Sequence, residues 1–122
     1  MVLTELMRKS KPIKKARAKA NKVAAAAALS TITFTVAFYS GAGGIYFHGE
    51  GIPDNQYISS TMKVKSFSVQ QTPGHQIVTV SGSAPSSGKL TVTVSCGTKV
   101  LSPASENTFD KMTFGGFIVY DI

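Results

Sequence analysis

A strict two-residue alternation of apolar and hydroxyl side chains begins at Thr31 and leaves few folds open to this chain. In TITFTVAF, residues 31–38, the apolar residues Ile, Phe, Val and Phe alternate with Thr, Thr, Thr and Ala. Successive side chains of a β-strand point to opposite faces of a sheet. A period of two in β-branched and aromatic residues therefore predicts a strand with one buried face.

The same alternation recurs downstream, and turn-forming sequences separate its repeats. HQIVTVSGS and KLTVTVSC alternate in the same way, while GIPDNQ, TPG, APSSG and SPASEN supply the Gly, Pro, Asn and Ser typical of turns. Seven or eight short strands at close spacing are typical of a sandwich or a barrel. The sequence therefore predicts a mainly β fold, with a small antiparallel β-sandwich or open barrel over residues 30–122. The stretches 31–38 and 45–47, joined by SGAGG, are expected to form a hairpin.

The apolar phase of these segments gives the expected core. Each member lies on the apolar side of an alternating segment or in a short apolar run. The expected core residues are Phe34, Val36, Phe38, Phe47, Val78, Val80, Val92, Val94, Phe117 and Val119.

The first 22 residues carry the whole net charge of the chain. They hold eight bases and one acid, which gives +7, and this equals the net charge of all 122 residues. Residues 12–29 contain no glycine and are rich in Ala and Lys, which favour helix. The sequence therefore predicts a basic helical arm over residues 1–29, which would bind nucleic acid or another anionic partner. The candidate binding residues are Arg8, Lys9, Lys11, Lys14, Lys15, Arg17, Lys19 and Lys22.

A second interpretation of the region around the first strand remains open at this point. Residues 23–47 form a run of 25 residues without acid or base, preceded by the basic segment. Such a run is long enough for a transmembrane helix, with a β-domain after it. A cleaved signal peptide, with Ser40 and Ala42 at the cleavage site, is a third alternative. Several Ser, Thr and Gly residues weaken the membrane interpretation, and the alternation favours the strand.

The sequence contains no arrangement of residues typical of an active site. Five acids are spread over turns and strand ends, and His48 and His75 are isolated from one another. The single cysteine, Cys96, excludes an intrachain disulfide, and no Cys/His spacing typical of a metal site is present. GAGG, residues 41–44, lacks the helix that would complete a dinucleotide-binding fingerprint. We therefore expect no enzyme activity, no cofactor, no metal and no small-molecule substrate.

These observations favour a structural role in an assembly. We expect a non-enzymatic subunit of a large particle, specifically a virion protein such as a bacteriophage capsid, vertex or tail component. Other subunits would contact the β-domain, and nucleic acid or an acidic protein surface would contact the arm. The alternative is a single-pass membrane protein, located in a virion membrane, an envelope or a pilus-like or adhesive structure, with an exposed β-domain.

Overall fold

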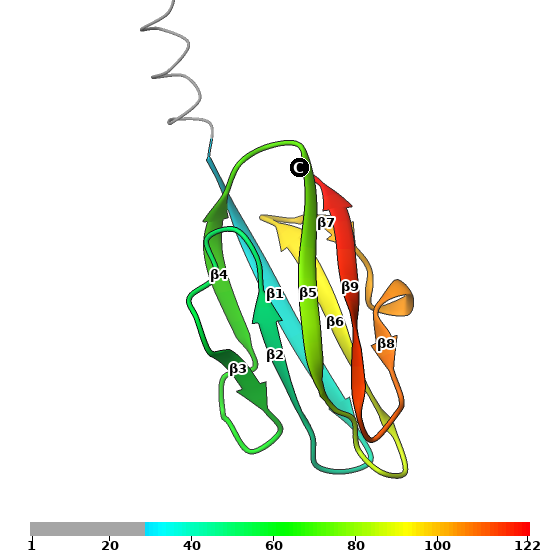
Figure 1. Cartoon of the computed structure of the whole chain (residues 1–122). Helices are drawn as coiled ribbons and strands as arrows, with labels where there is room; N and C mark the ends of the chain where they lie inside the picture. The colour runs from blue at the N-terminus through cyan, green and yellow to red at the C-terminus, as the bar shows by residue number, and fades with distance from the viewer. Residues whose placement is uncertain (1–28) are drawn as a thin grey trace, which may run out of the picture.

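The described part of the chain is a sandwich of two antiparallel β-sheets (Figure 1). A computed structural model describes residues 29–122, so the predicted helical arm lies outside the described residues except for Leu29. The described residues form nine strands and one short 3-10 turn, η1. Their bounds are β1 (Ser30–Tyr39), β2 (Gly44–His48), β3 (Gln56–Ser59), β4 (Ser66–Gln71), β5 (His75–Ser83), β6 (Lys89–Cys96), β7 (Lys99–Ser102), η1 (Ala104–Glu106), β8 (Thr108–Phe109) and β9 (Phe114–Asp121). The prediction of a mainly β fold is confirmed.

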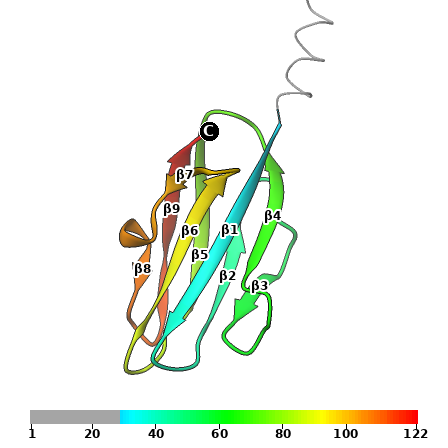
Figure 2. The ribbon, with the colours of Figure 1, turned by 180° about the vertical axis from the view of Figure 1, so that it is seen from behind.

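Neighbouring strands in each sheet are mostly distant in sequence. The first sheet, called sheet A here, has the order β4-β1-β6-β7, and β8 also pairs with β6. The second, sheet B, has the order β3-β2-β5-β9. Every pairing is antiparallel. Figure 1 looks onto sheet B, and Figure 2 shows sheet A from the opposite side.

Strands β1 and β2 do not form the expected hairpin. Strand β1 pairs with β4 and β6 in sheet A, whereas β2 pairs with β3 and β5 in sheet B. Ser40 and Gly41, directly after β1, have φ angles of 65° and 141°. These left-handed conformations turn the chain from one sheet to the other. The segment SGAGG, residues 40–44, reverses the chain as predicted, but it connects sheet A to sheet B instead of closing a hairpin.

The interpretation of residues 23–47 as a transmembrane helix is wrong. Residues 30–39 and 44–48 of this run are strands, and Ile32, Phe34 and Phe47 are fully buried between the sheets. The alternation at residues 31–38 therefore reports a half-buried strand. Among residues 29–122, no helix has both the length and the apolar character that a membrane span requires.

The core lies between the two sheets and is centred on aromatic rings. Phe34 of β1 stacks on Phe67 of β4, with ring centroids 4.9 Å apart, and contacts Phe47 of β2 and Tyr120 of β9 at 5.6 and 6.1 Å. The contacts with Phe47 and Tyr120 join sheet A to sheet B. The buried apolar residues are Ile32, Phe34, Val36, Ile45, Phe47, Ile58, Val69, Val78, Val80, Ala84, Leu90, Val92, Val94, Ile118 and Tyr120.

The expected core residues are correct on the alternating strands and wrong on β9. Of the ten expected, those on β1, β2, β5 and β6 are buried, apart from Phe38, which is partly buried. Phe117 and Val119 are 69% and 52% exposed. Pairing of β9 with β5 places Ile118 opposite Val78 and Tyr120 opposite Gln76, so these two face the core instead. The run FIVY is apolar at four consecutive positions, and its pattern cannot indicate which face is buried.

The position of Phe34 makes a direct prediction about stability. Phe34→Ala should lower the free energy of unfolding by about 3–5 kcal/mol, because it leaves a cavity between the sheets. The matched control is Phe117→Ala, the same substitution at an exposed ring, which should cost within about 0.5 kcal/mol. Urea unfolding followed by circular dichroism measures both. Equal losses for the two variants would contradict the assignment of the buried face.

Candidate interaction face on sheet B

The outward surface of sheet B carries a cluster of exposed apolar side chains. Tyr46, Tyr57, Ile77, Phe117 and Val119 are between 36% and 69% exposed. Each stands one position out of phase with a core residue of the same strand, because side chains alternate between the faces. These five residues are called the sheet B face below. They come from all four strands of the sheet.

Strand register arranges these residues in two groups, with the exposed Thr79 and Ser81 of β5 between them. Tyr46 lies directly opposite Tyr57, and their ring centroids are 4.4 Å apart. Ile77 lies opposite Val119, and Phe117 lies two positions away on β9, on the same face of the strand. A side chain at Gly44 would overlap the hydroxyl of Tyr57, so this glycine leaves the space that the ring occupies. The face therefore consists of a tyrosine pair on one side and an aliphatic and phenyl cluster on the other.

The apolar area of this face is substantial for a small domain. With about 200 Å² per aromatic side chain, the exposed fractions of its three rings leave roughly 300 Å² in contact with solvent. Ile77 and Val119 add to this area. The largest apolar patch on a monomeric protein is commonly a few hundred Å², and such patches often mark interaction sites. The sheet B face is a candidate interaction site by this measure.

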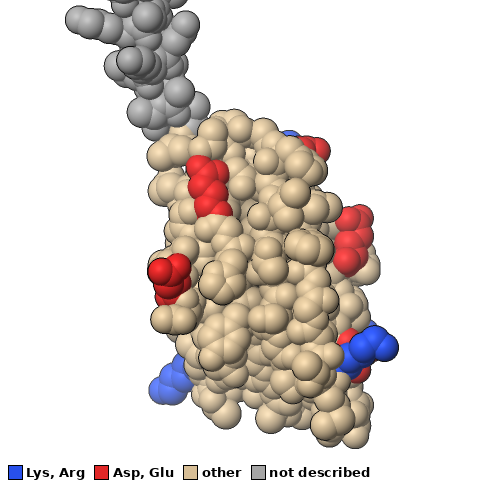
Figure 3. Space-filling model, in the orientation of Figure 1, with Lys and Arg blue, Asp and Glu red and all other residues tan. Residues whose placement is uncertain are grey.

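Charged groups lie at the margin of this face. Figure 3 shows acidic and basic side chains toward the edges of the molecule and none in the middle. At one end of β5 and β9, His75 Nδ1 lies 2.9 Å from Asp121 Oδ1, and the two side chains are 62% and 80% exposed. This pair is open to water, so it contributes little to stability. An uncharged centre lowers the cost of removing the face from water.

The outward face of sheet A has a different chemistry. It is lined by hydroxyl and amide groups, among them Thr31, Thr33 and Thr35 of β1. Thr33 Oγ1 lies 2.8 Å from Ser68 Oγ, and Gln70 Nε2 donates to Thr31 Oγ1 at 2.7 Å. These groups satisfy one another across the strands. The two faces of the sandwich therefore differ, and only sheet B presents a cluster of aromatic rings.

A hydrogen-bonded network closes one end of the sandwich. The carboxylate of Glu50 accepts hydrogen bonds from the hydroxyl and the N–H of Thr72 and, at 2.6 Å, from Gln76 Nε2. Gln71 Nε2 donates to the Glu50 carbonyl at 2.9 Å, and the Tyr120 hydroxyl donates to Gln71 Oε1 at 2.5 Å. The network ties the loop after β2 to the turn between β4 and β5. Its role is structural, since every member bonds another member.

The same contacts shift two pKa values. Hydrogen bonds from the Thr72 hydroxyl, from Gln76 and from the Thr72 N–H hold the pKa of Glu50 below its ordinary value of 4.5. Burial raises the pKa of Tyr120 to about 12, against the opposing effect of its hydrogen bond to Gln71. Tyr120 is therefore protonated at neutral pH, as its donation to Gln71 requires.

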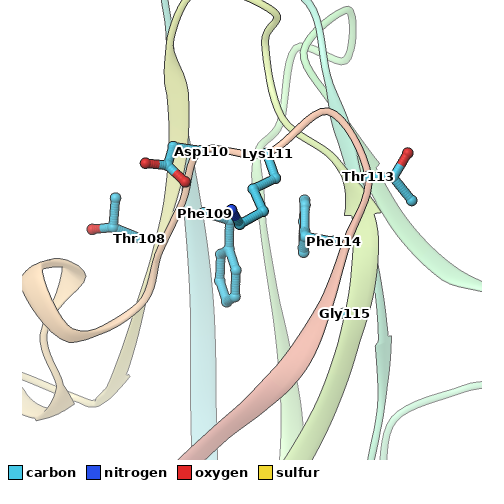
Figure 4. Close-up of a pocket in the computed structure, with 7 residues that line it drawn as sticks. All are labelled: Thr108, Phe109, Asp110, Lys111, Thr113, Phe114 and Gly115. Carbon is cyan, nitrogen blue, oxygen red and sulfur yellow. The ribbon is translucent and has the colours of Figure 1, made fainter.

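A shallow pocket lies where the chain crosses from sheet A to sheet B between β8 and β9. It has a volume of about 280 Å³. Phe109 and Phe114 stack with centroids 4.6 Å apart and planes 18° apart, and Asp110 and Lys111 line the pocket beside them (Figure 4). The stacked rings are themselves partly buried against the core. The pocket is wide and holds no converging set of hydrogen-bonding groups, so it defines no ligand.

The sequence-predicted binding residues lie outside the described part of the chain. Arg8, Lys9, Lys11, Lys14, Lys15, Arg17, Lys19 and Lys22 all precede residue 29. Within residues 29–122, no three His, Cys, Asp or Glu side chains are close enough to hold a metal ion. The sheet B face was missed by the sequence analysis. Its only signal was the unbroken apolar run FIVY, which exceeds what one buried face requires.

The chain was compared with protein-family models, with curated proteins and with solved structures, and no match was found.

The Glu50 network predicts a pH-dependent stability. A carboxyl with a lowered pKa stabilises the folded state above its ordinary pKa, and this stabilisation is lost as the pH falls through the folded-state value. Glu50→Gln should therefore unfold at a lower temperature than the parent protein at pH 7. This difference in unfolding temperature should be smaller at about pH 3. Thermal unfolding at several pH values measures it.

A matched control for this experiment is Glu106→Gln. The Glu106 side chain is exposed and makes no hydrogen bond with any described residue. Its replacement should leave the unfolding temperature nearly unchanged at both pH values. A constant difference between Glu50→Gln and the parent from pH 7 to about pH 3 would contradict the role assigned to the carboxylate.

Proposed function

We propose that this protein is a non-enzymatic structural subunit of a large assembly, specifically a virion such as that of a bacteriophage. In this proposal the β-domain packs against other subunits through the sheet B face, and the basic arm binds nucleic acid or an acidic protein surface. The observation that carries the proposal is the separation of charge from apolar surface. Residues 29–122 hold five bases and five acids, whereas all the net charge lies in residues 1–22.

The neutral domain suits repeated packing of identical subunits. Copies with a large net charge repel one another, and this opposes close association. Here the domain has zero formal net charge, and the centre of its apolar face is uncharged. Interfaces are depleted of charged residues at their core and enriched in Tyr and Phe. The sheet B face has this composition, with two tyrosines and one phenylalanine among its five residues.

The basic arm suits a polyanion. Lys and Arg that neutralise phosphates release condensed counterions, and this gives affinity without sequence preference. Eight bases within 22 residues supply many such contacts on a short segment. A structural subunit that must bind a packaged genome of any sequence needs this kind of affinity.

Titratable groups of the domain fit a structural role better than a catalytic one. The carboxylate of Glu50 already accepts three hydrogen bonds from neighbouring residues. The His75–Asp121 pair lies exposed at a sheet end, and no hydroxyl or thiol of the described residues is hydrogen-bonded to His75. A His–Asp pair in nucleophilic catalysis needs such a group within reach of the imidazole.

The test is the salt dependence of binding to duplex DNA of random sequence. The full chain should bind with log affinity falling by about 0.9 per phosphate neutralised for each log unit of salt, and deletion of residues 1–22 should abolish binding. Fluorescence anisotropy at a series of salt concentrations measures the slope.

A matched pair of variants locates the contact. Lys14→Gln/Lys15→Gln should reduce the slope by about 1.8, because two phosphate contacts are lost. Lys63→Gln/Lys65→Gln removes the same charge from the β-domain and should leave the slope unchanged. Equal effects of the two pairs would exclude the arm as the specific binding segment. If the full chain does not bind DNA at low salt, an acidic protein surface is favoured as the partner of the arm.

A further inference from the structure

Strand β9 forms one edge of sheet B and lacks the usual protection of edge strands. Natural proteins keep edges short or protect them with Lys, Pro or bulges, because an open edge can pair with another strand. The edge strands β3 and β7 have four residues each, and β4 has six. Strand β9 has eight, with the sequence FGGFIVYD, and contains no Lys, Arg or Pro. Strand β7 of the opposite sheet lies near β9 but forms no ladder with it.

The backbone groups on the open edge can be identified from the register. Gly74 and Ile122 exchange both N–H to O hydrogen bonds, at 3.0 and 2.9 Å. Hydrogen-bonded and non-hydrogen-bonded pairs alternate along an antiparallel ladder. Pairing therefore directs the N–H and C=O groups of Tyr120, Ile118 and Gly116 toward β5. The N–H and C=O groups that point away from β5 belong to Gly115, Phe117, Val119 and Asp121.

These outward-pointing backbone groups have no partner among residues 29–122. No backbone or side-chain hydrogen bond of the described residues joins them to another segment. The same residues place their side chains on the outer surface of sheet B, where Phe117 is the most exposed large apolar residue of the described chain. An open row of donors and acceptors beside exposed apolar side chains fits another β-strand of apolar character.

We infer that β9 pairs antiparallel with β9 of a second copy of this chain. The register that uses all four outward-facing residues places Phe117 opposite Val119 of the second copy, and Gly115 opposite Asp121 of the second copy. A two-fold axis repeats each pair, so the contact is closed and cannot extend into a fibre. The four strands of each sheet B then form one continuous sheet of eight strands.

The side chains of β9 are complementary to themselves in this arrangement but not in the parallel arrangement in register. An aromatic residue opposite a β-branched residue is a favourable cross-strand pair, and here it occurs twice. Each Asp121 faces a glycine, so no like charges lie opposite one another. Parallel pairing in register would place the two Asp121 carboxylates side by side, which is destabilising. The sequence of β9 therefore selects a second β9 in the antiparallel sense.

This inference rests on the proposed role as an assembly subunit and specifies one of its contacts. In the dimer, sheet B of one copy continues into sheet B of the other. The sheet B faces of the two copies therefore meet along the new pair of β9 strands. The remaining apolar residues, Tyr46, Tyr57 and Ile77, stay exposed and available to further subunits. The β9 edge accounts for one contact, and the rest of the face accounts for others.

Amide hydrogen exchange of the full chain, measured by NMR without nucleic acid, tests the pairing atom by atom. In the dimer, the N–H groups of Gly115, Phe117, Val119 and Asp121 should exchange as slowly as those of Ile118 and Tyr120. On dilution to the monomer, only the first four should become fast. Sedimentation gives the mass at each concentration.

Two substitutions at one position separate the backbone from the side chain. Val119→Pro removes an N–H that points away from β5, a place where an edge strand tolerates proline. It should weaken the dimer by about ten-fold or more, since one hydrogen bond is lost from each copy. Val119→Thr keeps the N–H and the β-branched shape and should weaken it far less.

Three results would overturn the inference. One is a monomer at concentrations up to about 1 mM, which means negligible affinity. Another is fast exchange of the Phe117 and Val119 amides in a sample with the mass of a dimer, which would place the contact elsewhere while leaving the assembly role intact. The third is an unchanged dimer with folded Val119→Pro. If that variant does not fold, exchange in the parent chain decides. Loss of DNA binding by the arm variants tests the proposed function separately.

Discussion

The contact of Phe34 with the rings of both sheets determines the rest of this structure. A sheet of four or five strands needs a partner to cover its apolar face. Phe34 and Phe67 belong to sheet A, and Phe47 and Tyr120 to sheet B, so this cluster is where the faces meet. Once these rings face inward, alternation along β2 and β9 forces Tyr46, Phe117 and Val119 to face outward. The candidate interaction face is thus a direct consequence of the core.

The sequence predicted the alternating strands well because one physical rule governs them. On β1 and β6, a single apolar phase matches a single buried face, and the residues on that phase are buried, with Phe38 partly buried. The prediction of buried residues failed on strand β9 because apolar residues occupy both of its faces. Only the ladder with β5 determines that Ile118 faces the core. The ambiguity was informative, since a strand with two apolar faces on an edge leaves one of them exposed.

The strand order and the sheet B face could not be predicted from the sequence, for a related reason. The segment SGAGG indicates a turn, but turn chemistry does not distinguish a hairpin from a crossover between two sheets. The sheet B face depends on the register of four strands, which local patterns do not specify. Tyr46 and Tyr57, for example, are neighbours only because β2 and β3 pair at that register. The eight basic residues of the arm were identified from the sequence, and they lie outside the described residues.

The strand order has a consequence for how this chain folds. Strand β1 must pair with β4 and β6, β2 with β5, and β5 with β9, so four of the seven ladders close a long loop. Chains dominated by contacts between distant residues fold slowly, in milliseconds to seconds, because the entropy of loop closure is lost before the contacts form. Strand β9 is also the last of the described strands to leave the ribosome. Until it arrives, β5 has an open edge, and the inner surface of sheet B lacks Ile118 and Tyr120. The nascent domain is therefore vulnerable to wrong pairing until β9 emerges, and a slow rate of synthesis prolongs that exposure.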